Sequence, residues 1–291
     1  MSGTITVNKK RVALASVCAA VFLTLSKLLI GLFTGSLGLL SEALHSCLDM
    51  VAAIITYFSV RISDKPADSD HNYGHGKVEN LSALVETFLL LVTCVWIIYE
   101  AAGRLISGKF EIEVTIWSYI VVITSIAVDF TRSRALMKAA KQHNSQALEA
   151  DAIHFSTDIW SSSVVLLGLI CSGFGFHIAD PVAALFVAVI VVYVSFRLGK
   201  NAVDVLLDKA TDDYHEIVEG ARLEVPEVTS VHEIKIRRAG ADVFIEMVVH
   251  LDPSLTVNDA HRISHELENL IMERIERCTV HIHQEPEETL V

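Results

Sequence analysis

The sequence predicts an α-helical integral membrane protein with six transmembrane helices, followed by a C-terminal cytoplasmic α/β domain. Three observations support this fold class. Of the 291 residues, 52% are hydrophobic and 20% are charged, which is too apolar for an ordinary soluble protein of this size. Residues 1–200 contain six long apolar stretches, with 15 acidic and 15 basic side chains. Residues 201–291 carry 20 acidic and 8 basic side chains, so the whole net charge of −12 lies in this last part.

The six apolar stretches are long enough to cross a bilayer, because a helix needs about 20 residues to span the hydrocarbon core. They cover residues 12–33, 38–62, 81–106, 114–132, 152–174 and 178–198. The first is too long for a cleaved signal peptide, and the second follows it after a short turn. The sequence therefore predicts a transmembrane domain of six helices over residues 1–205.

The basic residues of this domain indicate its orientation. Of the 15 Lys and Arg in residues 1–200, twelve lie on one side of the predicted spans, Arg104 and Lys109 lie on the other, and Lys27 lies inside the first span. The positive-inside rule then places both chain termini in the cytoplasm. An acidic cytoplasmic domain disfavours nucleic acid as a partner, because both are polyanions. We expect its partner to be a cation.

Residues 206–291 alternate between helical and strand periodicity and form the second predicted domain. Helical spacing covers residues 212–225 and 258–276, and strand patterns cover residues 230–238, 242–252 and 278–284. The order αββαβ predicts a small open-faced sandwich of the metallochaperone type.

Ionisable residues at membrane depth are the most informative feature, because each costs at least a few kcal/mol in a bilayer. His45 and Asp49 in the second span, and His154 and Asp158 in the fifth, are two i,i+4 pairs. Each pair lies on one helical face. Together they offer two imidazole nitrogens and two carboxylates, which suit Zn²⁺ and tolerate Cd²⁺, Co²⁺, Fe²⁺ or Mn²⁺.

Two other interpretations of these pairs fit the sequence less well. Two structural His–Asp hydrogen bonds would explain one pair, but the repetition in a second span favours a metal site. An intramembrane metalloprotease does not fit, because the sequence has no His-Glu-x-x-His. Four protein ligands also leave no position for a catalytic water. The sequence therefore predicts that the protein is not an enzyme.

Three further acids at membrane depth have roles that the sequence leaves open. Glu86 is either a second proton carrier or a structural acid. Asp129 lies near Arg132 and is expected to form an interfacial ion pair with it. Asp151 lies one turn before His154 and either orients its ring or faces the cytoplasmic entrance.

Three ordered segments resemble the cation diffusion facilitator family, closest to its bacterial YiiP-like branch. They are GSLGLLSEALHSCLD at 35–49, PADSDHNYGHGKVE at 66–79 and ADAIHFSTD at 150–158. The resemblance covers essentially the whole chain. It implies a homodimeric, proton-coupled exporter of divalent transition metals in the lipid bilayer of a bacterial inner membrane, working by alternating access.

The resemblance assigns the transport site to His45, Asp49, His154 and Asp158. Some YiiP-like members have Asp at the first of these positions, and His there resembles zinc-preferring members, which favours Zn²⁺ over iron. Protons and metal compete for these atoms, because binding requires neutral imidazole and ionised carboxylate. Our leading hypothesis is a proton-coupled antiporter that exports Zn²⁺ from the cytoplasm. The alternative is a membrane-anchored metal sensor or scaffold that binds Zn²⁺ without transport, which would have no use for four ligands inside the bilayer.

The resemblance also implies a metal site and a charge pair outside the membrane. Asp68, His71 and His75 match the family's loop metal site between the second and third spans. Lys77 matches a residue that pairs with an Asp after the sixth span, here Asp208. Such a pair would couple the two domains.

A further regulatory metal site is implied in the cytoplasmic domain, near the dimer interface. The matching ligands are His232, His261, His283 and Glu285. Two departures from the family pattern matter. Glu285 replaces a shorter Asp, and Val248 stands where another His is usual. His250 lies two residues later on the same strand face, and whether it substitutes stays open.

Overall fold

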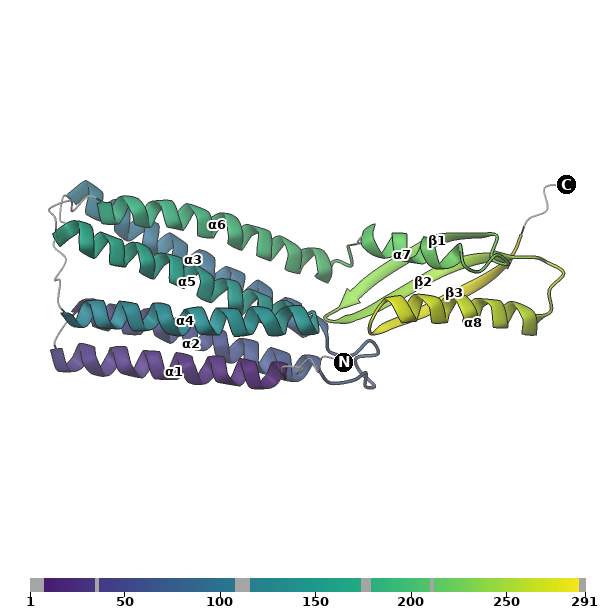
Figure 1. Ribbon diagram of the computed structural model, residues 1–291, viewed down its shortest axis with the longest axis horizontal. Helices are drawn as coiled ribbons and strands as arrows, with labels where there is room; N and C mark the ends of the chain where they lie inside the picture. Colours follow the sequence, from purple (N-terminus) through teal and green to yellow (C-terminus); the bar gives the residue numbers. More distant parts are fainter. Residues whose placement is uncertain (1–7, 35–36, 108–115, 174–178, 210–211, 288–291) are drawn as a thin grey trace, which may run out of the picture. The chain divides into compact units, whose positions relative to one another are not determined.

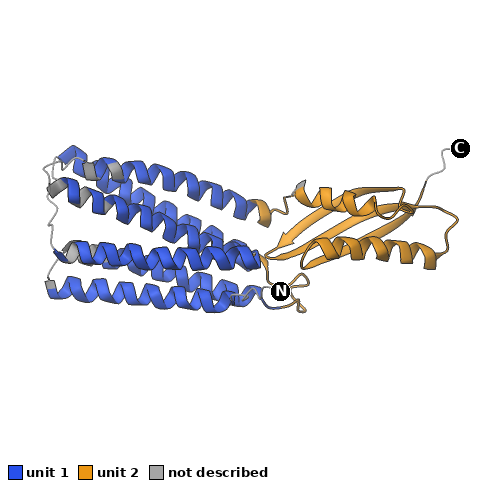
Figure 2. Cartoon of the chain, in the orientation of Figure 1, with its two compact units in different colours: residues 1–65, 78–203 blue, residues 66–77, 204–291 orange. Residues whose placement is uncertain are grey.

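The computed structural model describes residues 8–34, 37–107, 116–173, 179–209 and 212–287. Parts of three predicted spans, namely residues 114–115, 174 and 178, lie outside these ranges. The chain divides into two compact units (Figure 2). The first contains residues 1–65 and 78–203, and the second contains residues 66–77 and 204–291. The short segment 66–77 therefore groups with the C-terminal part of the chain.

Six long helices make up the first unit (Figure 1). They are α1 (Lys9–Thr34), α2 (Leu37–Ser63), α3 (Lys77–Ser107), α4 (Ile116–His143), α5 (Gln146–Gly173) and α6 (Ala179–Leu206). Each overlaps one of the predicted apolar stretches, so the helical transmembrane domain is confirmed. By length and composition, four segments within the described residues could cross a membrane, namely Lys9–Phe33, Ala43–Ser63, Lys77–Ser107 and Ala184–Leu206.

Small residues allow the helices of the first unit to pack closely. α1 packs along α2 and α4 along α5, and contacts of α1 with α4 and of α2 with α5 join these pairs. The shared core is rich in alanine, including Ala53 on α2 and Ala152 on α5, which lets backbones approach. Large apolar side chains such as Phe33 and Phe88 are 88% and 65% exposed. A surface of this kind is typical of a protein that contacts lipid.

The second unit contains the predicted αββαβ order, which confirms the fold class of this part. Its elements are α7 (Asp212–Arg222), β1 (Ser230–Ala239), β2 (Asp242–Leu251), α8 (Val257–Arg274) and β3 (Cys278–Pro286). The sheet order is β1-β2-β3, with β1 antiparallel and β3 parallel to β2.

Alternation along β2 separates the core face of the sheet from the other face. Val243, Ile245 and Val249 are buried in a cluster that includes side chains of α7 and α8. Phe244 and His250, at even-numbered positions, lie on the opposite face and are only partly buried. This face carries three of the histidines that were predicted to bind metal, namely His232, His250 and His283.

Candidate metal centre

Four ionisable side chains from α2 and α5 converge inside the first unit. Nε2 of His154 lies 3.2 Å from Asp49 Oδ1 and 3.5 Å from Asp158 Oδ2. His45 Nε2 lies 4.0 Å from Asp49 Oδ1. One ligand atom from each of His45, Asp49 and Asp158 lies within 4.8 Å of the others. The structure thus brings together all four side chains of the predicted membrane quartet, although Asp49 and His154 are 105 residues apart in sequence.

The distances in this quartet fit one tetrahedral metal ion. With metal–ligand bonds of about 2.0–2.2 Å, two ligands of a tetrahedral site lie about 3.3–3.6 Å apart. The separations of His154 from its two carboxylates, 3.2 and 3.5 Å, agree with this value. The 4.0 Å separation of His45 from Asp49 is slightly longer. Two imidazoles and two carboxylates form a donor set that suits Zn²⁺ and accepts other divalent transition metals.

The burial of most of the quartet favours the binding of a cation. The side chain of His154 is 4% exposed and that of Asp158 is 15% exposed. Among the described residues, His154 Nδ1 and Asp158 Oδ2 have no hydrogen-bond partner. A buried oxygen without a hydrogen bond lowers the stability of the folded state, and a metal ion bound to Asp158 would offset that loss. His45 is the most accessible member, with 36% of its side chain exposed.

Residues of α1 support the turn of α2 that carries His45. Ser46 accepts a hydrogen bond from Lys27 Nζ at its hydroxyl, 2.9 Å away, and another from Thr24 Oγ1 at its carbonyl, also 2.9 Å away. Through Ser46, Lys27 thus contacts the turn that carries His45. The sequence interpretation had not connected Lys27 with the metal ligands. The position of Lys27 inside an apolar span could have indicated this link, because a cation at membrane depth normally has an acidic partner.

Two of the three other membrane-depth acids are linked through Arg132. Arg132 Nη1 donates to Asp129 Oδ1 at 3.1 Å, so the predicted ion pair is present, and both side chains are buried among the helices. Arg132 also donates to Ser16 Oγ at 3.1 Å, and Ser16 donates to Asp151 Oδ2 at 3.2 Å. Asp151 is fully buried, and its recorded hydrogen bond goes to Ser16 rather than to the ring of His154.

Glu86 is held by hydroxyl groups. It is fully buried on α3, and its Oε1 accepts hydrogen bonds from Thr56 of α2 and from Ser82, which lies 3.4 Å away. Its Oε2 has no hydrogen-bond partner among the described residues. The structure therefore shows a hydrogen-bonded acid at this position.

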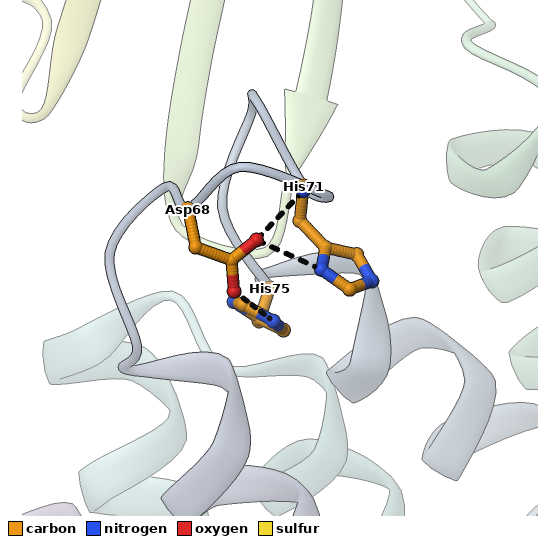
Figure 3. A group of neighbouring side chains, drawn as sticks. All are labelled: Asp68, His71 and His75. Carbon is orange, nitrogen blue, oxygen red and sulfur yellow. Dashed lines mark hydrogen bonds and ion pairs between the residues drawn. The ribbon is translucent and has the colours of Figure 1, made fainter.

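Asp68, His71 and His75 form a second cluster, in the loop between α2 and α3 (Figure 3). Asp68 Oδ1 lies 3.1 Å from His71 Nδ1, and Asp68 Oδ2 lies 3.4 Å from His75 Nε2. The two imidazole centroids are 4.3 Å apart. One ligand atom from each side chain lies within 4.8 Å of the others. This geometry brings together the three residues predicted for the loop metal site.

Backbone hydrogen bonds fix the carboxylate of Asp68 before any metal binds. The backbone N–H of His71 donates to it at 2.7 Å, and the N–H of Asp70 donates at 3.0 Å. The bond from His71 is the main reason why the pKa of Asp68 lies below its ordinary value of 3.8. The carboxylate therefore stays ionised at neutral pH, and its ordering effect is lost only as the pH falls through the lowered pKa.

The predicted charge pair is present. Lys77 Nζ donates to Asp208 Oδ1 at 2.7 Å, and both side chains are about two-fifths exposed. Both residues belong to the second unit. An exposed pair of this kind stabilises by about 1 kcal/mol or less.

The third cluster lies on the sheet of the second unit and includes His250. His232, His250 and Glu285 each offer a ligand atom within 4.8 Å of the others. The imidazole centroids of His232 and His250 are 4.6 Å apart, and His250 Nε2 is 3.4 Å from Glu285 Oε2. A β-bulge follows His232, where Glu233 adopts a φ of 51°. Bulges redirect side chains near functional sites.

Two other predicted ligands lie outside this group of three. His283 Nε2 is 3.5 Å from Glu285 Oε1, so it borders the cluster from β3. His261 lies on α8, where its ring stacks on that of His265 at 6.0 Å. Within the described part of one chain, the candidate site is therefore built from His232, His250 and Glu285, with His283 beside it.

A further charged cluster, not predicted from the sequence, joins the ends of four segments in the first unit. Glu79 is buried at the start of α3 and accepts hydrogen bonds from Lys9 at 3.0 Å, Ser63 at 2.6 Å and Ser145. Lys9 also pairs with Asp64 at 2.6 Å. An acid in the first turn of a helix is a favourable position, but sequence alone does not tell which distant donors it will meet.

Comparisons with known proteins identify the family of both parts of the chain. A family model described as the cation efflux transmembrane domain matches residues 13–207, and one described as the cytoplasmic domain of cation efflux proteins matches residues 210–287. A relative from Shewanella oneidensis, named cation-efflux pump FieF, is 32% identical over 94% of this chain and 92% of its own length. The protein of the same name from Escherichia fergusonii is 30% identical over 95% and 92%, respectively.

Among solved structures, the metal-bound C-terminal domain of the CzcD transporter from Thermotoga maritima is 29% identical. It covers 27% of this chain and 93% of its own length, with a TM-score of 0.26.

Proposed function

Because the chain belongs to the cation diffusion facilitator family of cation-efflux transporters, we propose that it is not an enzyme and that it exports Zn²⁺ from the cytoplasm in exchange for protons. The membrane quartet is the transport site in this proposal. The single observation that carries it is the convergence of His45, Asp49, His154 and Asp158 inside the helical unit, with 3.2–4.0 Å between neighbouring ligand atoms.

The chemistry of the quartet supports zinc and supports exchange with protons. Zn²⁺ has no geometric preference of its own and is commonly held by imidazole and carboxylate ligands in a tetrahedron. Each ligand must lose its proton before it binds metal, so protons arriving at the site displace the ion. Exposure of the site alternately to each side of the membrane would turn this competition into antiport.

The surrounding arrangement extends this proposal. All six long helices cross the inner membrane, with both termini in the cytoplasm, and residues 1–205 and 206–291 form its two domains. The loop and sheet clusters bind cytoplasmic metal. The family model for the second domain is named ZT_dimer, which supports a homodimer.

A membrane-anchored sensor or scaffold that binds Zn²⁺ without moving it is the alternative function. Both functions require zinc binding, but only the transporter moves the ion across a sealed membrane. The four ligands favour transport, because a cytoplasmic sensor would gain nothing from placing them at membrane depth.

Zinc flux in proteoliposomes tests the proposal. The full chain is reconstituted with a zinc-sensitive dye inside the vesicles and a pH gradient across them, and Fe²⁺, Mn²⁺ and Cd²⁺ are compared with Zn²⁺. We expect a zinc flux that depends on the pH gradient, and a proton flux in the opposite direction. Asp49→Asn and His154→Ala should reduce it at least about a hundredfold, because they remove ligands rather than their supporting groups.

His215→Ala is the matched control, because it removes a histidine on α7 that lies outside the three clusters. Its flux should equal that of the unmodified chain. Saturable zinc binding with no flux would support the sensor instead. Unchanged flux in both quartet variants would show that zinc crosses elsewhere.

A further inference from the structure

The loop that carries Asp68, His71 and His75 is anchored to the β1–β2 hairpin by an arginine that lies against two aromatic rings. The guanidinium carbon of Arg237 lies 3.6 Å from the ring centroid of Tyr73 and 5.5 Å from that of Phe244. The rings of Tyr73 and Phe244 meet edge to face at 5.2 Å. Arg237 and Phe244 are partners in the β1–β2 register, so the sheet itself places both groups under Tyr73.

The contacts of Arg237 indicate that the aromatic rings are its main partners. Among the described residues its buried Nε has no hydrogen-bond partner. Its nearest carboxylate oxygen, on Glu246, is 3.8 Å away. A guanidinium over an aromatic face is stabilised by the charge distribution of the ring, and more strongly when it is shielded from water. The contact of Arg237 with the Tyr73 ring is therefore closer than its ion pair with Glu246.

A second anchor lies three residues further along the loop. A Cβ atom on Gly76 would overlap the carbonyl oxygen of Ala239, and one on Gly240 would lie 2.8 Å from the carbonyl oxygen of Gly76. Gly240 also has a φ of 64°, in the left-handed region. The loop backbone and the hairpin turn thus approach at a distance that two glycines allow.

These two anchors lie on either side of one metal-ligand candidate. His75 stands between Tyr73 and Gly76 in sequence, and 12% of its side chain is exposed. The other two candidates, Asp68 and His71, are about half exposed and are held by hydrogen bonds within the loop. The position of His75 relative to Asp68 consequently depends on the hairpin.

We propose that Tyr73 and Arg237 are positioning residues of the loop metal site. By holding residues 73–76 on the β1–β2 hairpin, they set the place of His75 relative to Asp68 and His71, so the affinity of the loop for a divalent transition metal depends on the second domain. This inference rests on the proposed metal binding by the loop. Neither positioning residue contacts the metal itself.

Co²⁺ binding to the full chain in detergent tests this role, because the visible absorption of Co²⁺ reports the number and type of its ligands. The starting protein carries Asp49→Ala, His154→Ala, His232→Ala and His250→Ala, which disable the other two clusters. In this background, His71→Ala should abolish the remaining absorption bands. That result identifies the loop as their source.

Tyr73→Ala and Arg237→Ala, each added to the same background, should weaken Co²⁺ binding about tenfold, the size expected for a shielded cation–π contact. Tyr73→Phe keeps the ring and should restore the affinity and the spectrum. Arg262→Ala removes an exposed arginine of α8 and should change neither. Hydrogen exchange of residues 66–76 without metal should be faster in Tyr73→Ala than in Tyr73→Phe.

Co²⁺ affinity in Tyr73→Ala within twofold of the starting protein would overturn the positioning role, whatever the exchange rates. Equal loss of affinity in Tyr73→Phe and Tyr73→Ala would also overturn it, because the ring would then not be the anchor. Absorption bands that persist in His71→Ala would show that the loop is not the metal site. That failure would leave zinc flux through the membrane quartet unaffected, so the two proposals fail separately.

Discussion

His250 reaches the sheet cluster because of the register of three strands. Side chains on one face of a strand recur at every second residue, so His250 and Val248 share a face. β1 pairs His232 with Val248, and β3 pairs Glu285 with His250. His250 therefore meets His232 diagonally, at 4.6 Å between ring centroids, and meets Glu285 directly. The longer side chain of Glu, compared with the usual Asp, accompanies this two-residue displacement.

His250→Ala should lower the zinc affinity of the second domain, and adding Val248→His should restore it, because position 248 lies opposite His232. Thermal unfolding of fragment 206–291 measures this. At a free zinc concentration of about 100 Kd, binding stabilises by about 2.7 kcal/mol, which raises Tm by roughly 10 °C or more. The shift should fall to less than half in His250→Ala and recover in the double variant. An equal shift in all three proteins would remove His250 from the site.

At single positions, the sequence predicted the ligands but not most of their supporting groups. The i,i+4 spacing of His45 with Asp49 follows from helix geometry alone, and the rarity of membrane charges makes it informative. Tyr73 and Arg237 give no comparable signal, because an aromatic residue in a loop and an arginine on a strand are common. Their contact depends on how the loop folds against the hairpin, which local patterns do not encode.

Among the helices, α3 and α6 approach closely at one glycine. Leu90, Cys94, Val187 and Val191 form a shared cluster of buried side chains. A Cβ on Gly199 of α6 would lie 2.8 Å from Cγ2 of Thr87 on α3. Thr87 cannot turn away freely, because its hydroxyl donates to the carbonyl of Ala83 at 2.8 Å and its branched Cβ restricts χ1.

Gly199→Ala should therefore destabilise the helical unit by about 1–3 kcal/mol, the usual cost of overpacking, although alanine favours a helix by about 1 kcal/mol over glycine. Thr87→Ser removes Cγ2 and keeps the hydroxyl. In that background the same substitution should be neutral or stabilising, since the next atoms of Thr87 lie 3.6 and 3.7 Å away. Thermal unfolding in detergent compares the four proteins. Equal effects of Gly199→Ala in both backgrounds would contradict this close contact.

Element boundaries show where the sequence prediction falls short. The apolar run of the fourth span ends at residue 132, but α4 continues to His143. Leu136 and Ala139 of this extension are fully buried in the bundle core, while Arg134 and Lys138 alternate with them. The length of an apolar run predicts a membrane span. The extension of α4 is amphipathic and does not lengthen that run, so its end was not predicted. The αββαβ order was predicted more closely, because periods of 2 and 3.6 residues are distinct.

For the whole molecule, the candidate metal sites fall into two different compact units. Every distance within the membrane quartet joins residues of the first unit, and the loop and sheet clusters belong to the second. Between these units the chain passes three times, after residues 65, 77 and 203. The loop between α2 and α3 thus links the helix that carries His45 and Asp49 with the cytoplasmic part.

This division predicts the behaviour of a chain that ends at residue 205. The quartet should still bind zinc and exchange it for protons, at a rate within about tenfold of the full chain, because all of its contacts remain. Residues 66–76 should exchange their amide hydrogens faster, since Arg237, Gly240 and Asp208 are absent. Flux in proteoliposomes and hydrogen exchange measure the two effects. Asp49→Asn in the shortened chain should abolish the flux. A shortened chain that keeps its helical circular dichroism but loses all exchange would show that the quartet works only together with the second unit.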